Sequence, residues 1–140
     1  AMLSRFRASP LYAEIMQAAA VYRELPFVYE HDGFIVRGVM DVLYRTPGGE
    51  WVVVDYKTSR VKSKSPNEPT DAELVTHAQR YHLQLGVYAS AVYKQLGVYP
   101  RARIHYVQYK NPTVEVSEAA WRAALDRTLS ERVRAVILGE

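Results

Sequence analysis

The sequence predicts an α/β domain in which a small mixed β-sheet is flanked by helices. Three observations support this prediction. Residues 27–30, 34–44 and 51–57 are rich in β-branched and aromatic residues and are bounded by turn signals, so they predict three consecutive strands. Residues 70–96 and 117–137 have amphipathic patterns and capping residues that predict helices. A further strand is predicted between these helices, and the resulting order of strands and helices is typical of an α/β domain.

The chain begins with a predicted helix over residues 11–22. Ser9 is a suitable N-cap, and Pro10 fits the first helical position because an N–H has no helical partner there. Apolar residues recur at helical spacing along one face. Pro26 cannot continue a helix, so the segment is expected to end before it.

The three strands that follow are predicted to form an antiparallel meander. An Asp-Gly turn within residues 31–33 is a strong hairpin signal between the first two strands. The third strand, residues 51–57, reads Trp-Val-Val-Val-Asp-Tyr-Lys, and its apolar run is typical of a strand buried on both faces. An acid and a lysine at its end are unusual, because charges beside a core are normally paired or bind something.

The second half of the chain opens with a polar segment, residues 58–69, that predicts a loop. Thr70 and Glu73 form a predicted capping box at the start of a long helix that runs to Leu96, with Gly97 as its C-cap. The remaining predicted elements are two short strands and a last amphipathic helix, over residues 103–109, 113–116 and 117–137.

The composition is that of one ordinary globular domain over residues 1–140, with 49% hydrophobic and 24% charged residues. The chain has no Cys, which excludes a disulfide scaffold, a thiolate zinc site, an iron–sulfur cluster and a cysteine nucleophile. Its apolar runs are shorter than the roughly 20 residues of a membrane span, and it shows no signal peptide, so we expect a cytoplasmic protein without a membrane partner. The Ala1-Met2 start indicates a fragment of a longer chain.

Three charged residues converge if the second and third strands are hairpin neighbours. Asp41 lies on the second strand, and Asp55 and Lys57 lie two apart on the third, so they share a face. Two carboxylates can share one Mg²⁺ or Mn²⁺ ion, and the main-chain carbonyl of Tyr56 is a candidate further ligand. Such an ion activates water and neutralises phosphate charge, and a nearby lysine can orient or deprotonate that water. The pattern predicts a metal-dependent site that cleaves phosphodiesters.

A simpler interpretation stays open for two of these residues. Asp55 and Lys57 alone could be a surface ion pair, which is worth about 0–1 kcal/mol. Asp41 favours a functional site, because an acid within the apolar run Val39–Leu43 is unfavourable unless it is paired or binds a ligand.

Three further polar residues are candidates for the same site. Gln84 and Tyr88 lie four apart on the long helix, so they share a face and could hydrogen-bond a phosphate or a water. Glu24 is a candidate ligand or a residue that orients the lysine. The alternatives are a polar helix edge and a solvated acid. The four histidines lack the spacing of a shared metal site and are expected to be structural or surface residues.

If the partner is a nucleic acid, three basic residues in the predicted loop, Arg60, Lys62 and Lys64, are expected to contact its phosphates and make binding sensitive to salt. The mild net charge of +3 is compatible with a nucleic-acid partner. The alternative is a solvated segment without a partner.

These motifs together resemble the RecB-like branch of the PD-(D/E)XK nuclease superfamily. The matching segments are Gly38-Val-Met-Asp41, Val53-Val-Asp55-Tyr-Lys57-Thr58 and Gln84-x-x-x-Tyr88. The segment 23–27, Arg-Glu-Leu-Pro-Phe, resembles the one before the first strand in AddA/RecB helicase–nucleases. The resemblance implies a restriction-endonuclease-like fold and Mg²⁺-dependent cleavage of DNA.

The resemblance also implies a role for each matching residue. Asp41 and Asp55 are implied to be metal ligands, Lys57 the catalytic lysine, and Gln84 and Tyr88 the helix motif that supports the site. It further implies a helicase domain in the same longer chain, a second protein as partner, and work in DNA double-strand-break repair and recombination.

One feature departs from the family pattern. The family usually has a histidine ligand on an upstream helix, and residues 1–23 contain no histidine. The alternative function is therefore a catalytically inactive DNA-binding or scaffold module that retains the nuclease fold. The missing histidine favours this alternative, whereas the retention of Asp41, Asp55 and Lys57 argues against it.

Overall fold

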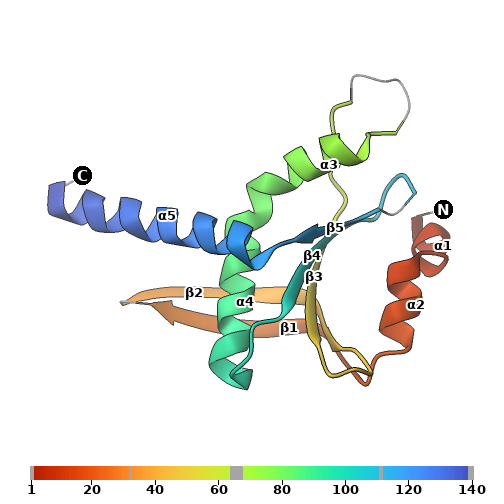
Figure 1. Ribbon diagram of the computed structural model, residues 1–140, viewed down its shortest axis with the longest axis horizontal. Coiled ribbons are helices and arrows are strands. Elements are labelled where there is room, and N and C mark those ends of the chain that lie inside the picture. The colour runs from red at the N-terminus through yellow and green to blue at the C-terminus, as the bar shows by residue number, and fades with distance from the viewer. Residues whose placement is uncertain (1, 32, 64–67, 111, 139–140) are drawn as a thin grey trace.

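A computed structural model describes residues 2–31, 33–63, 68–110 and 112–138 of the chain (Figure 1). Its helices and strands are α1 (Met2–Arg7), α2 (Pro10–Met16), β1 (Ala20–His31), β2 (Phe34–Arg45), β3 (Trp51–Lys57), α3 (Asp71–Ala78), the 3₁₀ turn η1 (Gln79–Tyr81), α4 (His82–Leu96), β4 (Arg101–Tyr106), β5 (Thr113–Val116) and α5 (Glu118–Leu138). In these residues we find no helix with both the length and the apolarity to cross a membrane.

The five strands form one mixed sheet in the order β1-β2-β3-β4-β5. β1, β2 and β3 pair antiparallel, as the meander prediction requires. β3 and β4 are parallel, because the chain crosses over through α3 and α4 between them, and β5 then pairs antiparallel with β4. The predicted mixed sheet with flanking helices is confirmed.

The central strand β3 is buried on both faces, as its apolar run predicted. Val53 belongs to the core between the sheet and α4, whereas Val52 and Val54 belong to a second core beneath α2. All three valines are fully buried. Figure 1 shows α4 on one side of the sheet and α2 on the other, with α5 extending away from the body of the domain. β3 is therefore a rigid support for the residues at its end.

The first predicted helix is shorter than expected. Ser9 caps it as predicted, with its hydroxyl accepting the Tyr12 N–H at 3.3 Å, but α2 ends at Met16. The chain then joins the sheet, starting from the hydrogen bond of the Ala19 N–H to the Arg45 carbonyl at 2.8 Å. Pro26 lies inside β1 rather than after a helix. An edge strand tolerates proline because one side of its backbone has no ladder to complete.

Three other boundaries differ from the prediction. The capping box of Thr70 and Glu73 and the left-handed Gly97 cap are both present, but the helix between them is interrupted by η1. β4 covers residues 101–106 instead of 103–109, because the chain turns after Tyr106 to bring the Pro112 carbonyl onto the Tyr106 N–H. α1 was not predicted.

Gly86 allows α4 and α5 to approach each other closely. A Cβ at this position would lie 3.0 Å from the main-chain oxygen of Trp121, which cannot move unless α5 shifts. Glycine to alanine normally stabilises a helix interior by about 0.5–1 kcal/mol. We expect Gly86→Ala instead to destabilise the domain by about 1–2 kcal/mol in urea unfolding, because of this overpacking. The exposed control Gln95→Ala should be close to neutral, and a stabilised Gly86→Ala would contradict this packing.

Candidate active site

The Asp41 carboxylate continues the pairing of β2 with β3 where their backbones separate. The ladder between the two strands extends only as far as the pair Val42 and Val54. At the next position Asp41 Oδ2 accepts the main-chain N–H of Tyr56 at 2.7 Å. This bond fixes the carboxylate beside the end of β3. Since an ionised carboxylate has about four acceptor sites, Asp41 keeps capacity for a cation.

Near Asp41, the side chains of β1 and β2 no longer alternate regularly between the two faces of the sheet. Val42 packs in the core beneath α2, whereas both Met40 and Leu43 pack in the core beneath α4. The β1–β2 ladder pairs Arg23 with Val42 and Leu25 with Met40 but skips Glu24 and Asp41 between them. Glu24 has a φ of 50°, which is unusual for a residue other than glycine. Strained backbone of this kind concentrates at functional sites. Glu24 thus lies within β1, not at the end of a helix, and is exposed.

The Lys57 ammonium connects β3 to α4. Its Nζ lies 2.7 Å from Asp55 Oδ2 and donates to Gln84 Oε1 at 3.1 Å. Gln84 Nε2 in turn donates to the Tyr88 hydroxyl at 2.9 Å, and that hydroxyl donates to the Val39 carbonyl at 3.4 Å. The contacts therefore run without interruption from Asp55, through the α4 pair, to the backbone of β2.

Asp55 is almost fully buried, with 4% of its surface exposed. Burial raises the pKa of its carboxyl group to about 6. The Lys57 ammonium opposes this effect on the pKa, and the Asp41 carboxylate adds to it. Asp55 Oδ2 lies 2.7 Å from the Lys57 ammonium and has no other hydrogen-bond partner among the described residues. A buried oxygen of this kind is suited to a cation.

Asp41 and Asp55 together fit one divalent metal ion. Mg²⁺ is typically held by one or two carboxylates, with water and phosphate oxygens in its other positions. Among the described residues there is no cluster of three or more His, Cys, Asp or Glu side chains that could enclose a metal. With two carboxylates from the described residues, the other ligands of such an ion would be main-chain, water or phosphate oxygens. A role for the Tyr56 carbonyl stays a prediction.

The basic loop lies next to the site with two of its cations exposed. Arg60 and Lys62 flank Val61, which is nearly buried and donates its N–H to the Tyr109 hydroxyl at 2.8 Å. This anchor turns both cationic side chains toward solvent. The third basic residue, Lys64, lies outside the described residues.

Sequence reasoning missed one residue beside Lys57, whereas His77 has the structural role that was expected. The ring of Tyr81 lies against the Lys57 ammonium, yet Tyr81 falls at the helical spacing of the core residues and gave no separate signal. His77 is buried and shares a hydrogen bond of 2.8 Å with the Tyr106 hydroxyl, which is the structural role that was expected.

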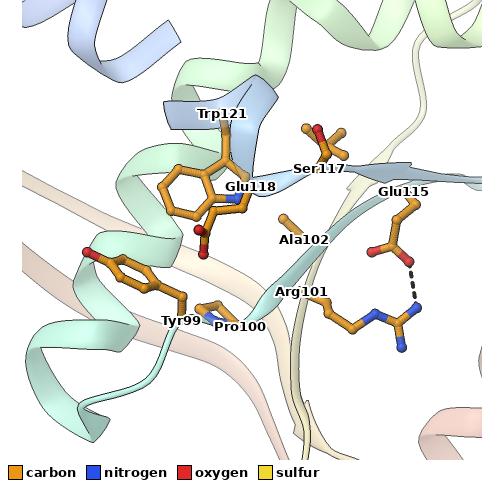
Figure 2. A pocket seen from close by; sticks show the side chains of 9 residues that line it. Tyr99, Pro100, Arg101, Ala102, Glu115, Ser117, Glu118 and Trp121 are labelled. Carbon is orange, nitrogen blue, oxygen red and sulfur yellow. Dashed lines mark hydrogen bonds and ion pairs between the residues drawn. The ribbon is translucent and has the colours of Figure 1, made fainter. Parts of the chain in front are cut away.

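A separate hollow of about 400 Å³ lies at the other end of β4, around Tyr99, Arg101 and Glu115 (Figure 2). Its charges compensate one another, since Arg101 contacts Glu115 at 2.6 Å. Arg122 covers the Tyr99 ring at 4.3 Å, so that ring offers little surface to a ligand. None of the predicted site residues lines this hollow.

The five-stranded mixed sheet and its flanking helices have the fold of a nuclease class. The family model of the PD-(D/E)XK nuclease superfamily matches residues 2–139 of the chain. This chain belongs to that superfamily. The predicted restriction-endonuclease-like α/β fold is thereby confirmed.

Similar curated proteins are components of helicase–nucleases. The chain is 32% identical over 104 residues to an ATP-dependent helicase/nuclease protein of Lysinibacillus sphaericus, a match that covers 71% of this chain and 8% of the relative. It is 34% identical over 119 residues to the protein of the same name from Desulfitobacterium hafniense, covering 80% of this chain and 8% of the relative. The chain thus spans less than a tenth of the length of these relatives.

A solved structure supports the fold. A protein from Eubacterium rectale described as a candidate exonuclease superposes with a TM-score of 0.62 at 19% sequence identity. The match covers 99% of this chain and 52% of that one. At this identity the likeness concerns the fold alone.

Proposed function

We propose that this chain is a nuclease domain that hydrolyses phosphodiester bonds of DNA with the help of Mg²⁺ or Mn²⁺. The observation that carries the proposal is the uninterrupted contact chain from Asp55 through Lys57 to Gln84 and Tyr88, beside Asp41. A surface ion pair would not explain it, because Asp55 is buried and its pKa is raised, so burial of this acid carries a free-energy penalty.

Each residue has a distinct task in the proposed reaction. Asp41 and Asp55 would hold the cation, which supplies neutralisation of phosphate charge and a more acidic water. Lys57 lies on the same face, where its ammonium can orient the attacking water or stabilise negative charge that develops on the phosphate. Gln84 and Tyr88 fix the direction of Lys57. Glu24, which the β1–β2 ladder skips at the same level as Asp41, is proposed as a further ligand or as an orienting acid.

The domain is proposed to be part of a longer helicase–nuclease that acts in DNA double-strand-break repair and recombination. The support is the similarity to helicase/nuclease proteins of which this chain covers only a small part. A helicase domain in the same chain, a second protein as partner, and a cytoplasmic location belong to this proposal.

The proposed activity can be tested by incubating the chain with single- and double-stranded DNA in Mg²⁺, Mn²⁺ or a chelator. We expect degradation that requires the divalent cation and that is lost in Asp55→Ala and Lys57→Ala. The alternative is an inactive DNA-binding module, and it predicts unchanged DNA binding with no cleavage in either metal. That result would overturn the proposed function.

Arg60 and Lys62 are proposed to contact DNA phosphates. Because each phosphate contact releases counterions, the double variant Arg60→Ala/Lys62→Ala should weaken DNA binding at all sequences. The slope of log affinity against log salt should become shallower by about 2 for duplex DNA. Fluorescence anisotropy at several salt concentrations measures this slope. An unchanged slope would show that the loop is merely solvated. Arg127→Ala, on the exposed surface of α5, is the matched control.

A further inference from the structure

We propose that Tyr81 is a positioning residue for Lys57, and that its aromatic face holds the ammonium in the direction needed for phosphodiester cleavage. This inference rests on the proposed nuclease function. The Lys57 Nζ lies over the Tyr81 ring, 4.2 Å from the ring centroid. That distance is well within the range of a cation–π interaction, which extends to about 6 Å.

The Tyr81 ring is one of three groups that surround the ammonium. The other two are Asp55 Oδ2 at 2.7 Å and Gln84 Oε1 at 3.1 Å. These three groups enclose the ammonium on several sides, and the Lys57 side chain as a whole keeps 18% of its surface exposed. A substrate phosphate or water could approach from a side that these groups leave open.

The ring is itself held in place. Tyr81 ends the 3₁₀ turn that interrupts the α3–α4 helix, and such interruptions often mark functional positions. Its hydroxyl lies 3.4 Å from the Ser59 hydroxyl, and its ring centroid lies 5.6 Å from that of the buried His77. The interruption of the helix therefore presents a fixed aromatic face to the end of β3, a purpose that core packing alone does not explain.

A lysine needs such support because its side chain is long and flexible. In the absence of metal the Asp55 carboxylate attracts the ammonium most strongly. In the proposed nuclease, however, Asp55 is a metal ligand, so its negative charge is shared with the cation. The neutral oxygen of Gln84 and the π-face of Tyr81 are the contacts that do not depend on that charge. Tyr81 should therefore matter for the chemical step more than for DNA binding.

The first experiment measures DNA cleavage by Tyr81→Phe and Tyr81→Leu. We expect Tyr81→Leu to lower kcat by about 3- to 30-fold with little change in KM, since a cation–π contact is worth about 0.5–2 kcal/mol. Tyr81→Phe keeps the aromatic face and should retain kcat to within about twofold. Tyr93→Leu, an exposed tyrosine far along α4, is the control and should keep wild-type kcat.

A second series separates the ring's electrostatics from its packing. Phenylalanines with an increasing number of ring fluorines at position 81 keep the ring and progressively weaken the negative potential of its face. We expect kcat to fall with each added fluorine at constant KM. A flat series, or wild-type kcat in Tyr81→Leu, would overturn the proposal. The fluorinated series also decides the matter if Tyr81→Leu does not fold.

A third readout needs neither metal nor activity. Because the end of the Lys57 side chain lies over the Tyr81 ring, the ring current should shift its ε-CH₂ proton signals upfield in the metal-free protein. The shift should persist in Tyr81→Phe and vanish in Tyr81→Leu. Unshifted Lys57 signals in the wild type would overturn the positioning role. If the shift is present but no metal supports cleavage, the proposed nuclease function fails while the contact itself stands.

Discussion

Asp55→Asn is expected to abolish DNA cleavage and, at the same time, to make the metal-free domain more stable at neutral pH. Cleavage is lost because the amide is a poor cation ligand and one of the two carboxylates proposed to hold the cation is removed. Stability is gained because an ionised Asp55 is unfavourable in the fold, where its pKa is raised from 3.8 to about 6. This difference corresponds to about 3 kcal/mol as an upper value, since one pKa unit is worth about 1.4 kcal/mol.

The stability effect has a defined dependence on pH. A raised carboxyl pKa favours the folded state fully below the pKa of the unfolded chain, and this contribution is lost as the pH rises through about 6. The advantage of Asp55→Asn should therefore be small near pH 4 and largest above pH 7. Thermal unfolding across this range in a chelator measures it. The exposed control Asp126→Asn should show no such trend. A less stable Asp55→Asn at pH 7.5 would contradict the electrostatic account.

Lys57→Met is expected to lower the cleavage rate by about 10²- to 10⁴-fold, the range for loss of a positioned acid–base group. Methionine keeps much of the length of the side chain but removes the ammonium that contacts Asp55 and Gln84. DNA binding should change little, because the loop cations remain. Single-turnover cleavage together with fluorescence anisotropy separates the two effects.

Lys57→Arg should not restore the rate, because the planar guanidinium cannot take the place of a compact ammonium between these groups. Lys94→Met is the matched control, since Lys94 contacts the Glu30 carbonyl and the Tyr29 ring instead of the site. A Lys57→Met enzyme that cleaves DNA at the wild-type rate would remove Lys57 from the mechanism.

Much of the fold could be predicted from the sequence because its local signals agree with its tertiary packing. The Trp51–Lys57 strand has the expected ends, since its valines fill two cores and its turn residues bound it clearly. The capping box at Thr70 and the glycine cap at Gly97 also matched, because each satisfies backbone groups with residues close in sequence. The convergence of Asp41, Asp55 and Lys57 was expected from the hairpin, whereas the association of Gln84 and Tyr88 with them was implied by the family resemblance.

The failures lie where tertiary contacts decide the outcome. Residues 20–22 were predicted to end a helix, but they pair with β2 and belong to β1, and an edge strand accepts Pro26. The interruption of the helix at η1 contains no glycine or proline, so the sequence does not predict it. The position of Tyr81 against Lys57 depends on this interruption and was therefore not predicted either. The left-handed backbone conformation of Glu24 was also not predicted, because the residue that usually signals this conformation is glycine.

The central claim is that Asp41 and Asp55 bind a divalent cation at the end of β3. Titration of Mn²⁺ into the isotope-labelled chain tests it most directly, because this paramagnetic ion broadens the signals of nearby nuclei even when it binds weakly. We predict saturable broadening centred on Asp41 and on Asp55 to Lys57, which Mg²⁺ reverses by competition and which Asp55→Asn abolishes. Broadening centred elsewhere in the chain, or none at millimolar Mn²⁺, would contradict the claim.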